Sequence, residues 1–300
     1  MTSKFPETAK FEEIGQRLRA YRLGKGLTAN EIAERIGVSR AAVYRLEKGE
    51  LVKIETIEKL SELLDVSLPS LMGVEVEYYN NAVSFFERMR QLEKDASYVL
   101  GNFSPISFLL LSDNYIDHLR VMLNESVRDT YPGAAGPEGY IEKLLDILRE
   151  RRAAAKKRRT PIVSIVGSRD IERFLWLGLI GRFDLPPKVA HERRLAAREE
   201  IERFIRLMQN APIGVQVGVV VDMPPTQTFQ VFEIDAAPAV TLSPYRLGDQ
   251  PNIWSGIAMA TSAPEAVRLF KNTITGLWDV AHKGEAGARI LQSLLDKMPR

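Results

Sequence analysis

The residue types that carry most enzyme chemistry are sparse in this sequence. None of the 300 residues is cysteine, so disulfides, thiol nucleophiles and cysteine-ligated metal sites are excluded. The histidines His118, His191 and His282 lie far apart, without a metal-ligand spacing such as H-E-x-x-H. No nucleophile elbow, phosphate-binding loop or dinucleotide fingerprint is present. The sequence therefore predicts a protein that is not an enzyme and holds no metal or cofactor.

Composition is typical of a soluble protein with sizeable cores. Hydrophobic residues make up 45% of the chain and charged residues 27%, and a length of 300 residues suits two domains. The formal net charge of +2 does not by itself indicate a nucleic-acid partner. Apolar runs such as 106–111 are too short to cross a bilayer, and the N-terminus has no apolar signal core. We therefore expect a cytoplasmic protein without a membrane partner.

The strongest local pattern lies in residues 11–73, where five short helices are predicted. Apolar residues recur at helical spacing over 12–23 and 54–64, and a last helical turn covers 68–72. Between these, Thr28 and Glu31 form a capping box, and Ser39 caps the next helix. Gly37 stands at the turn, where the backbone needs a positive φ. The pattern predicts two short helices packed at a steep angle.

The segment LTANEIAERIGVSRAAVYRLEKGE, residues 27–50, resembles the phage-repressor-like (XRE) helix-turn-helix family. The resemblance extends over roughly residues 11–73. In that family the second of the paired helices lies in the major groove of duplex DNA. The resemblance implies that residues 39–48 form this helix and that the protein is a transcriptional regulator. A homodimer on two operator half-sites is the expected assembly.

The resemblance also assigns residue roles. The positions that face bases are Arg40, Ala41, Tyr44 and Arg45. Arginine can donate two hydrogen bonds to one guanine, and alanine can contact a thymine methyl group. The expected phosphate contacts are Thr28, Ser39 and Lys48, with Arg17 and Lys53 as further candidates. Arg22 and Glu47 match a pair that the family uses as an internal salt bridge.

Two positions depart from the family pattern. Ala29 stands where the family often has a glutamine that reaches phosphate, and Glu50 lies in a loop where positive charge is common. For Arg40 and Arg45, the alternative to base contact is an ordinary solvated surface charge. Both departures bear on the strength of the contacts to the DNA backbone.

The mixture of helical and strand patterns in residues 74–300 predicts a larger α/β domain around a mixed sheet. With the helical module before it, the whole chain is expected to be α+β. Residues 76–100 show helical periodicity, so we expect a connector or dimerisation helix over 74–101, with an ordinary core helix as the alternative. Strands are expected at 104–112, 161–167, 239–243 and 251–260, and a hairpin at 215–223 and 228–236. Helices are expected at 170–178, 188–209, 263–282 and 286–297.

The element order after residue 101 resembles the non-catalytic phospholipase-D-like sensor domains of some regulators. The catalytic H-x-K-x4-D pattern of that family is missing here, because Leu119 and Arg120 follow His118, and Lys283 follows His282. We therefore expect residues 102–300 to form a sensor or effector domain that senses a small molecule, mediates dimerisation, or does both. The alternatives are control by a protein partner, as in antitoxins, and an enzyme tethered to a DNA module. The basic run 149–159 is either a DNA contact or a solvated helix face.

Overall fold

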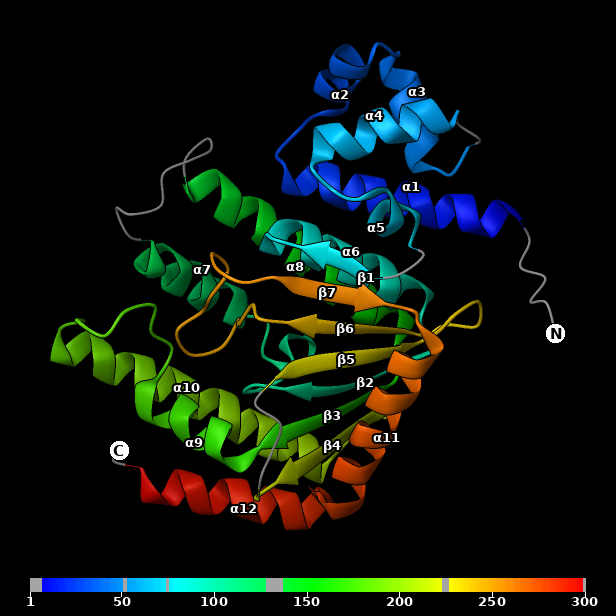
Figure 1. The fold of residues 1–300 in the computed structure, drawn as a ribbon. Helices are drawn as coiled ribbons and strands as arrows, with labels where there is room; N and C mark the ends of the chain where they lie inside the picture. Colours follow the sequence, from blue (N-terminus) through cyan, green and yellow to red (C-terminus); the bar gives the residue numbers. More distant parts are fainter. Residues whose placement is uncertain (1–6, 51–52, 74–75, 128–136, 223–226, 299–300) are drawn as a thin grey trace.

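The computed structural model describes residues 7–50, 53–73, 76–127, 137–222 and 227–298 (Figure 1). Five helices form the N-terminal module, as predicted. They are α1 (Glu7–Gly24), α2 (Ala29–Ile36), α3 (Arg40–Glu47), α4 (Ile54–Leu64) and α5 (Leu68–Met72). In Figure 1, α2, α3 and α4 lie on the side of α1 that faces away from the sheet.

Local sequence signals explain the turn between α2 and α3. Thr28 caps α2 in a capping box with Glu31, and the Ser39 hydroxyl accepts a hydrogen bond from the N–H of Ala42. Gly37 has φ 74° and ψ 38°, a left-handed conformation that glycine adopts without steric cost. Ile32 and Val43 are fully buried between the two helices. Capping, turn and core therefore specify the same geometry.

The second part of the chain is an eight-stranded sheet with helices on both faces. The strands are β1 (Val76–Tyr79), β2 (Tyr98–Phe103), β3 (Ile162–Gly167), β4 (Val215–Val220), β5 (Thr228–Glu233), β6 (Ala239–Ser243), β7 (Ala258–Thr261) and β8 (His282–Lys283). The helices are α6 (Ala82–Asp95), the 3-10 helix η1 (Phe108–Leu110), α7 (Tyr115–Ser126), α8 (Pro137–Arg158), α9 (Ser168–Leu177), α10 (Pro187–Gln209), α11 (Pro264–Val280) and α12 (Gly284–Lys297).

The strand order is β1-β7-β6-β5-β2-β3-β4-β8, and β2, β3 and β4 run parallel while the other pairs are antiparallel. This mixed sheet confirms the α+β class. The sheet face that carries Val231 and Ile165 packs under α11, through Val267 and Ile274. Helices α6, α7, α8 and α10 contribute to the larger core on the other face. Figure 1 shows α11 crossing the sheet on its own side.

Three predictions in this region are wrong. Residues 76–100 are not one helix, because their ends form β1 and part of β2. The helix between them, α6, is buried by the rest of the chain along most of its length, which agrees with the alternative of an ordinary core helix. Residues 104–112 contain η1 and no strand. The strands β4 and β5 do not pair with each other, since β5 lies between β6 and β2.

The N-terminal module is fixed to the sheet domain through α1. Tyr21 stacks on Tyr79 of β1 with ring centroids 4.9 Å apart, and both rings are buried. Gln91 of α6 donates a hydrogen bond to the Gln16 carbonyl at 3.0 Å. On α8, the Lys143 ammonium donates to the Leu23 carbonyl at 2.8 Å. Helix α1 therefore belongs to both cores, and α6 and α8 both hold it.

Candidate nucleic-acid interface

One face of α3 carries the residues that were predicted to contact bases. Arg40, Ala41, Tyr44 and Arg45 are all exposed, whereas Val43 and Leu46 on the opposite face are buried in the module. Spacings of one, four and five residues place side chains on one side of a helix. The structure therefore leaves this face of α3 free to enter a groove.

Two side chains of this face, Arg40 and Tyr44, contact each other. The Arg40 guanidinium donates to the Tyr44 hydroxyl at 3.2 Å and lies 5.4 Å from the centroid of the Tyr44 ring. Both are exposed, so the pairing is weak and can be exchanged for contacts to a base or a phosphate. The Tyr44 ring limits the directions in which the Arg40 side chain extends.

Arg45 forms a surface ion pair with Glu50, with Nε and Oε2 3.6 Å apart. Both side chains are more than half exposed, so the pair contributes little to stability. The carboxylate nevertheless lies beside a residue proposed to bind DNA, where it repels phosphate. Glu50 is one of the two departures from the family pattern, and its negative charge lowers the positive potential around Arg45.

The predicted phosphate-contact residues lie at the ends of the short helices. The Thr28 hydroxyl accepts from the Glu31 N–H at 3.2 Å and donates to Glu31 Oε2 at 2.8 Å. The Glu31 carboxylate also accepts a hydrogen bond from the backbone N–H of Thr28. This hydrogen bond lowers the pKa of the Glu31 carboxyl and keeps the group ionised. Lys48, at the C-terminal end of α3, and Lys53, at the start of α4, are exposed and make no helix-capping side-chain hydrogen bond.

Arg22 and Glu47 form a buried pair that ties α1 to α3. The Arg22 guanidinium contacts both Glu47 oxygens, at 2.5 and 3.1 Å, and also donates to the Leu27 carbonyl at 2.9 Å. Helix α1 passes close enough at Gly15 that an added Cβ would lie 2.5 Å from the Leu46 carbonyl oxygen. These contacts fix the position of α3 relative to α1.

The structure corrects the expectation for Arg17. Its side chain is 4% exposed and donates to Glu77 of β1 at 2.5 Å and to Glu13 at 3.0 Å. Glu77 also binds Arg88 of α6 at 2.8 and 3.0 Å and accepts from the Tyr79 hydroxyl at 2.5 Å. Arg17 therefore holds the two parts of the chain together and is not placed to contact phosphate.

Lys143 is a cation near this interface that the sequence did not indicate. It lines a shallow cavity of about 400 Å³ together with Thr28, Arg40 and Tyr44. Burial and the neighbouring Arg22 lower the pKa of the Lys143 ammonium. It lies on α8, about seventy residues beyond the module, so only the fold reveals this position.

Among the residues that the structure describes, no group of three or more histidine or acidic side chains is arranged to hold a metal ion. The same residues contain no helix long and apolar enough to cross a membrane.

Comparison with known proteins agrees with this geometry. A family model described as "Helix-turn-helix" matches residues 18–71. The chain is 35% identical over 96 residues to the HTH-type transcriptional repressor RghR of Bacillus subtilis, which covers 30% of this chain and 71% of that protein. It is 35% identical over 80 residues to the HTH-type transcriptional regulator SinR of Bacillus subtilis, covering 25% of this chain and 72% of SinR. A putative HTH-type transcriptional regulatory protein of Pyrococcus furiosus, PF1851, is 46% identical over 55 residues, 18% of each chain.

The chain is thus a DNA-binding transcriptional regulator of the helix-turn-helix class. It belongs to the family of helix-turn-helix regulators that includes RghR and SinR, and the similarity covers the N-terminal third of the chain or less.

Proposed function

We propose that this regulator reads a specific operator with α3. The observation that carries the proposal is the split of α3 into two faces: Arg40, Tyr44 and Arg45 are exposed while Val43 and Leu46 are buried. Arginine side chains on such a face can donate to the two acceptors, O6 and N7, that guanine presents in the major groove. Thr28, Ser39, Lys48 and Lys53 are proposed to contact phosphates on either side.

The protein binds DNA as a homodimer in this proposal. A single module buries roughly 600–1,000 Å² of protein surface on DNA, less than most specific complexes bury. Two copies bind half-sites roughly 34 Å apart, or a multiple of that spacing. Because α6 is buried within the chain, the dimer contact lies elsewhere on the sheet domain.

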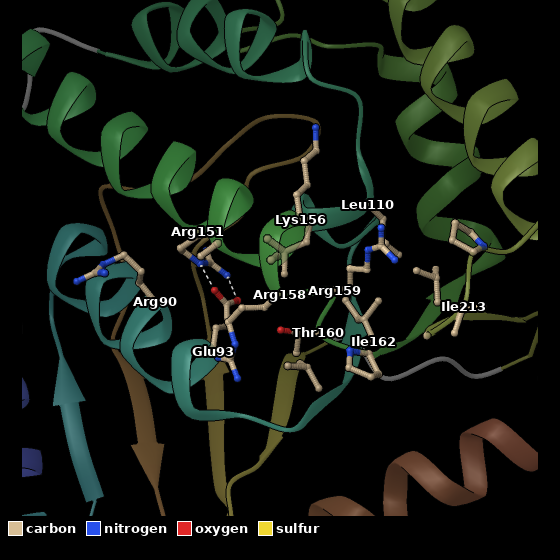
Figure 2. A pocket seen from close by; sticks show the side chains of 18 residues that line it. Arg90, Glu93, Leu110, Arg151, Lys156, Arg158, Arg159, Thr160, Ile162 and Ile213 are labelled. Carbon is tan, nitrogen blue, oxygen red and sulfur yellow. Dashed lines mark hydrogen bonds and ion pairs between the residues drawn. The ribbon is translucent and has the colours of Figure 1, made fainter.

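The sheet domain is proposed to sense a small molecule and to have no catalytic activity. It carries a cavity of about 640 Å³ at the end of the sheet where β2, β3 and β4 begin (Figure 2). This volume lies in the range of small-molecule sites, roughly 300–1,000 Å³. The names of the relatives support a regulator and not an enzyme.

Two other functions remain candidates, and each has a simple test. Control by a protein partner predicts co-purification of a second polypeptide in stoichiometric amount. A tethered enzyme predicts turnover of one or more of a panel of phosphodiesters.

Selection from a random duplex library tests the operator proposal. We expect the wild-type protein to enrich one motif with two half-sites whose centres are roughly 10 base pairs apart, or a multiple of that. Arg45→Ala should relax the preference at one position in each half-site. Arg35→Ala, which removes the same charge from an exposed site on α2, should enrich the wild-type motif. Failure of the wild-type protein to enrich any motif would overturn the proposal.

A further inference from the structure

The cavity in the sheet domain is lined by both cationic and apolar side chains. Its cationic residues come from the ends of α6 and α8 and from the residue after α8; they are Arg90, Arg151, Lys156, Arg158 and Arg159, against one carboxylate, Glu93. The apolar part of the lining consists of Val99, Leu109, Leu110, Ile162, Ile213 and Val215. Figure 2 shows Arg90, Arg151 and Arg158 on one side of the cavity, and Arg159 on the other side with Leu110, Ile162 and Ile213. A ligand that pairs with the cations and also packs against the apolar side chains is an organic anion with an apolar body.

Most of these cations already have partners. Arg151 binds Glu93 at 2.6 and 2.9 Å, and Lys156 pairs with Asp113. Arg158 donates to the backbone carbonyls of Glu93 and Ala96, at 3.0 and 3.3 Å. The Arg159 guanidinium is exposed and has no hydrogen bond or ion pair among the described residues. Arg159 is therefore the cation available to an incoming anion.

The backbone of Arg159 gives a second reason to single it out. Its φ of 54° lies in the left-handed region, directly after the end of α8, where helices most often have glycine. A side chain at such a position adds steric strain that glycine avoids. Strained residues at the edge of a cavity often mark a functional site.

The apolar part of the cavity lining is unusual for a protein surface because it includes a fully exposed aliphatic side chain. Ile213 is completely exposed, beside the first residues of β4. Leu110, which also lines the cavity, is 7% exposed. An apolar ligand body in the cavity removes the Ile213 side chain from water, which favours binding.

We propose that this cavity binds an amphipathic organic anion, with its acidic group at Arg159 and Arg151 and its apolar body against Ile213 and Leu110. This inference rests on the proposed regulator function and names the class of its effector. The anion competes with Glu93 for Arg151, so binding loosens the contact between α6 and α8.

The same two helices hold the DNA-binding module. On α6, Glu87 lies six residues before Glu93, roughly 9 Å along the helix, and pairs with Arg19 of α1 at 3.4 Å. On α8, Lys143 lies eight residues before Arg151, roughly 12 Å along the helix, and donates to the Leu23 carbonyl at 2.8 Å. A shift of α6 against α8 therefore moves both anchors of α1 and changes the position of α3.

Calorimetric titration with decanoate tests the site. We expect saturable binding of one decanoate per chain. Decan-1-ol, which has the chain without the charge, and acetate, which has the charge without the chain, should each bind at least tenfold more weakly. Decan-1-ol or acetate binding as tightly as decanoate would overturn the proposal.

Arg159→Gly separates binding from folding, because glycine suits the left-handed backbone there. This variant should unfold at the wild-type temperature or above it, yet bind decanoate at least tenfold more weakly. Arg159→Lys should retain most of the affinity. Lys157→Ala removes a charge from an exposed neighbour outside the cavity and should bind as the wild type does. Equal binding by Arg159→Gly and Lys157→Ala would overturn the assignment.

Operator affinity, measured with and without decanoate, tests the coupling and separates the two proposals. We expect saturating decanoate to change the affinity at least fivefold in the wild type and not in Arg159→Gly. Absence of decanoate binding in a protein that discriminates its operator overturns the cavity assignment alone. Decanoate binding that depends on Arg159, in a protein that does not discriminate between duplexes, overturns the operator proposal alone.

Discussion

Replacing Glu77 with glutamine should weaken the attachment of the DNA-binding module to the sheet domain. The Glu77 carboxylate is buried and accepts four hydrogen bonds, from Arg17, Tyr79 and twice from Arg88. Glutamine preserves the shape of the side chain but removes the negative charge. Arg88, which is 4% exposed, is then left without an anionic partner among the described residues.

The size of the effect follows from the burial of these charges. Removing one partner of a buried ion pair typically costs about 3–5 kcal/mol, because the other charge stays buried and uncompensated. A domain has a total stability of about 5–15 kcal/mol, so the loss is a large part of it. Arg17 keeps Glu13 as a partner, which places the main cost at Arg88.

Urea unfolding followed by far-UV circular dichroism and by tryptophan fluorescence measures this effect. Trp176, Trp254 and Trp278 all lie in the sheet domain, whereas the dichroism also reports the module. The matched control is Glu13→Gln, which removes the 43% exposed partner of the same Arg17 and should cost less than about 1 kcal/mol. A Glu77→Gln variant within about 1 kcal/mol of the wild type would refute the assignment of this cluster as the joint.

Three further predictions follow from the same structure. Burial by itself raises the pKa of Glu77, but pairing with Arg88 and Arg17 outweighs burial and lowers the pKa from 4.5 to about 2. The contribution of Glu77 to stability, about 3 kcal/mol, is therefore present above pH 4.5 and lost as the pH falls toward 2. The stability difference between wild type and Glu77→Gln should shrink over this range, and a constant difference contradicts the pKa assignment. Glu50→Gln should tighten binding to all duplexes about two- to fivefold at low salt and less at high salt, because it frees Arg45 and removes repulsion; weaker binding in anisotropy titrations would contradict this. Gly37→Ala should cost about 1 kcal/mol in urea unfolding because φ is 74°, whereas Gly276→Ala inside α11 should stabilise by about 0.5–1 kcal/mol, and an equal sign for both would refute the backbone argument.

The helix-turn-helix was predictable because its signals are local. The Thr28 capping box, the Ser39 cap and the left-handed Gly37 all lie within a dozen residues, and each specifies the same turn. Helix boundaries at 54–64 and 68–72 agree with α4 and α5 for the same reason.

The sheet was harder to predict because its pairings are distant in sequence. The strand β1 has only four residues, and its partner β7 lies about 180 residues later in the chain. The helical periodicity of the residues after β1 therefore dominates the sequence pattern there. The short run around Phe108 is apolar, and such a run does not distinguish a strand from a buried helical turn. The strands β4 and β5 are neighbours in sequence but pair with other strands.

The candidate site likewise combines features that local sequence predicts with features that depend on residues distant in sequence. The face of α3 follows from helical spacing, but the burial of Arg17 depends on Glu77, sixty residues away. Lys143 likewise reaches the interface from α8. The sequence predicts that the basic run 149–159 is a DNA contact or a solvated helix face. In the structure, Arg151 and Arg152 are buried and several other residues of the run line a cavity.

The most direct test of the account is the ratio of affinities for the selected operator and for a scrambled duplex of equal length. We expect a ratio of about 10³ or more for the wild type at physiological salt. Arg40→Ala and Arg45→Ala should each lower this ratio roughly 5- to 150-fold, the equivalent of about 1–3 kcal/mol. Lys48→Ala should weaken both duplexes alike and leave the ratio unchanged. An unchanged ratio in both arginine variants would contradict the claim that α3 reads the bases.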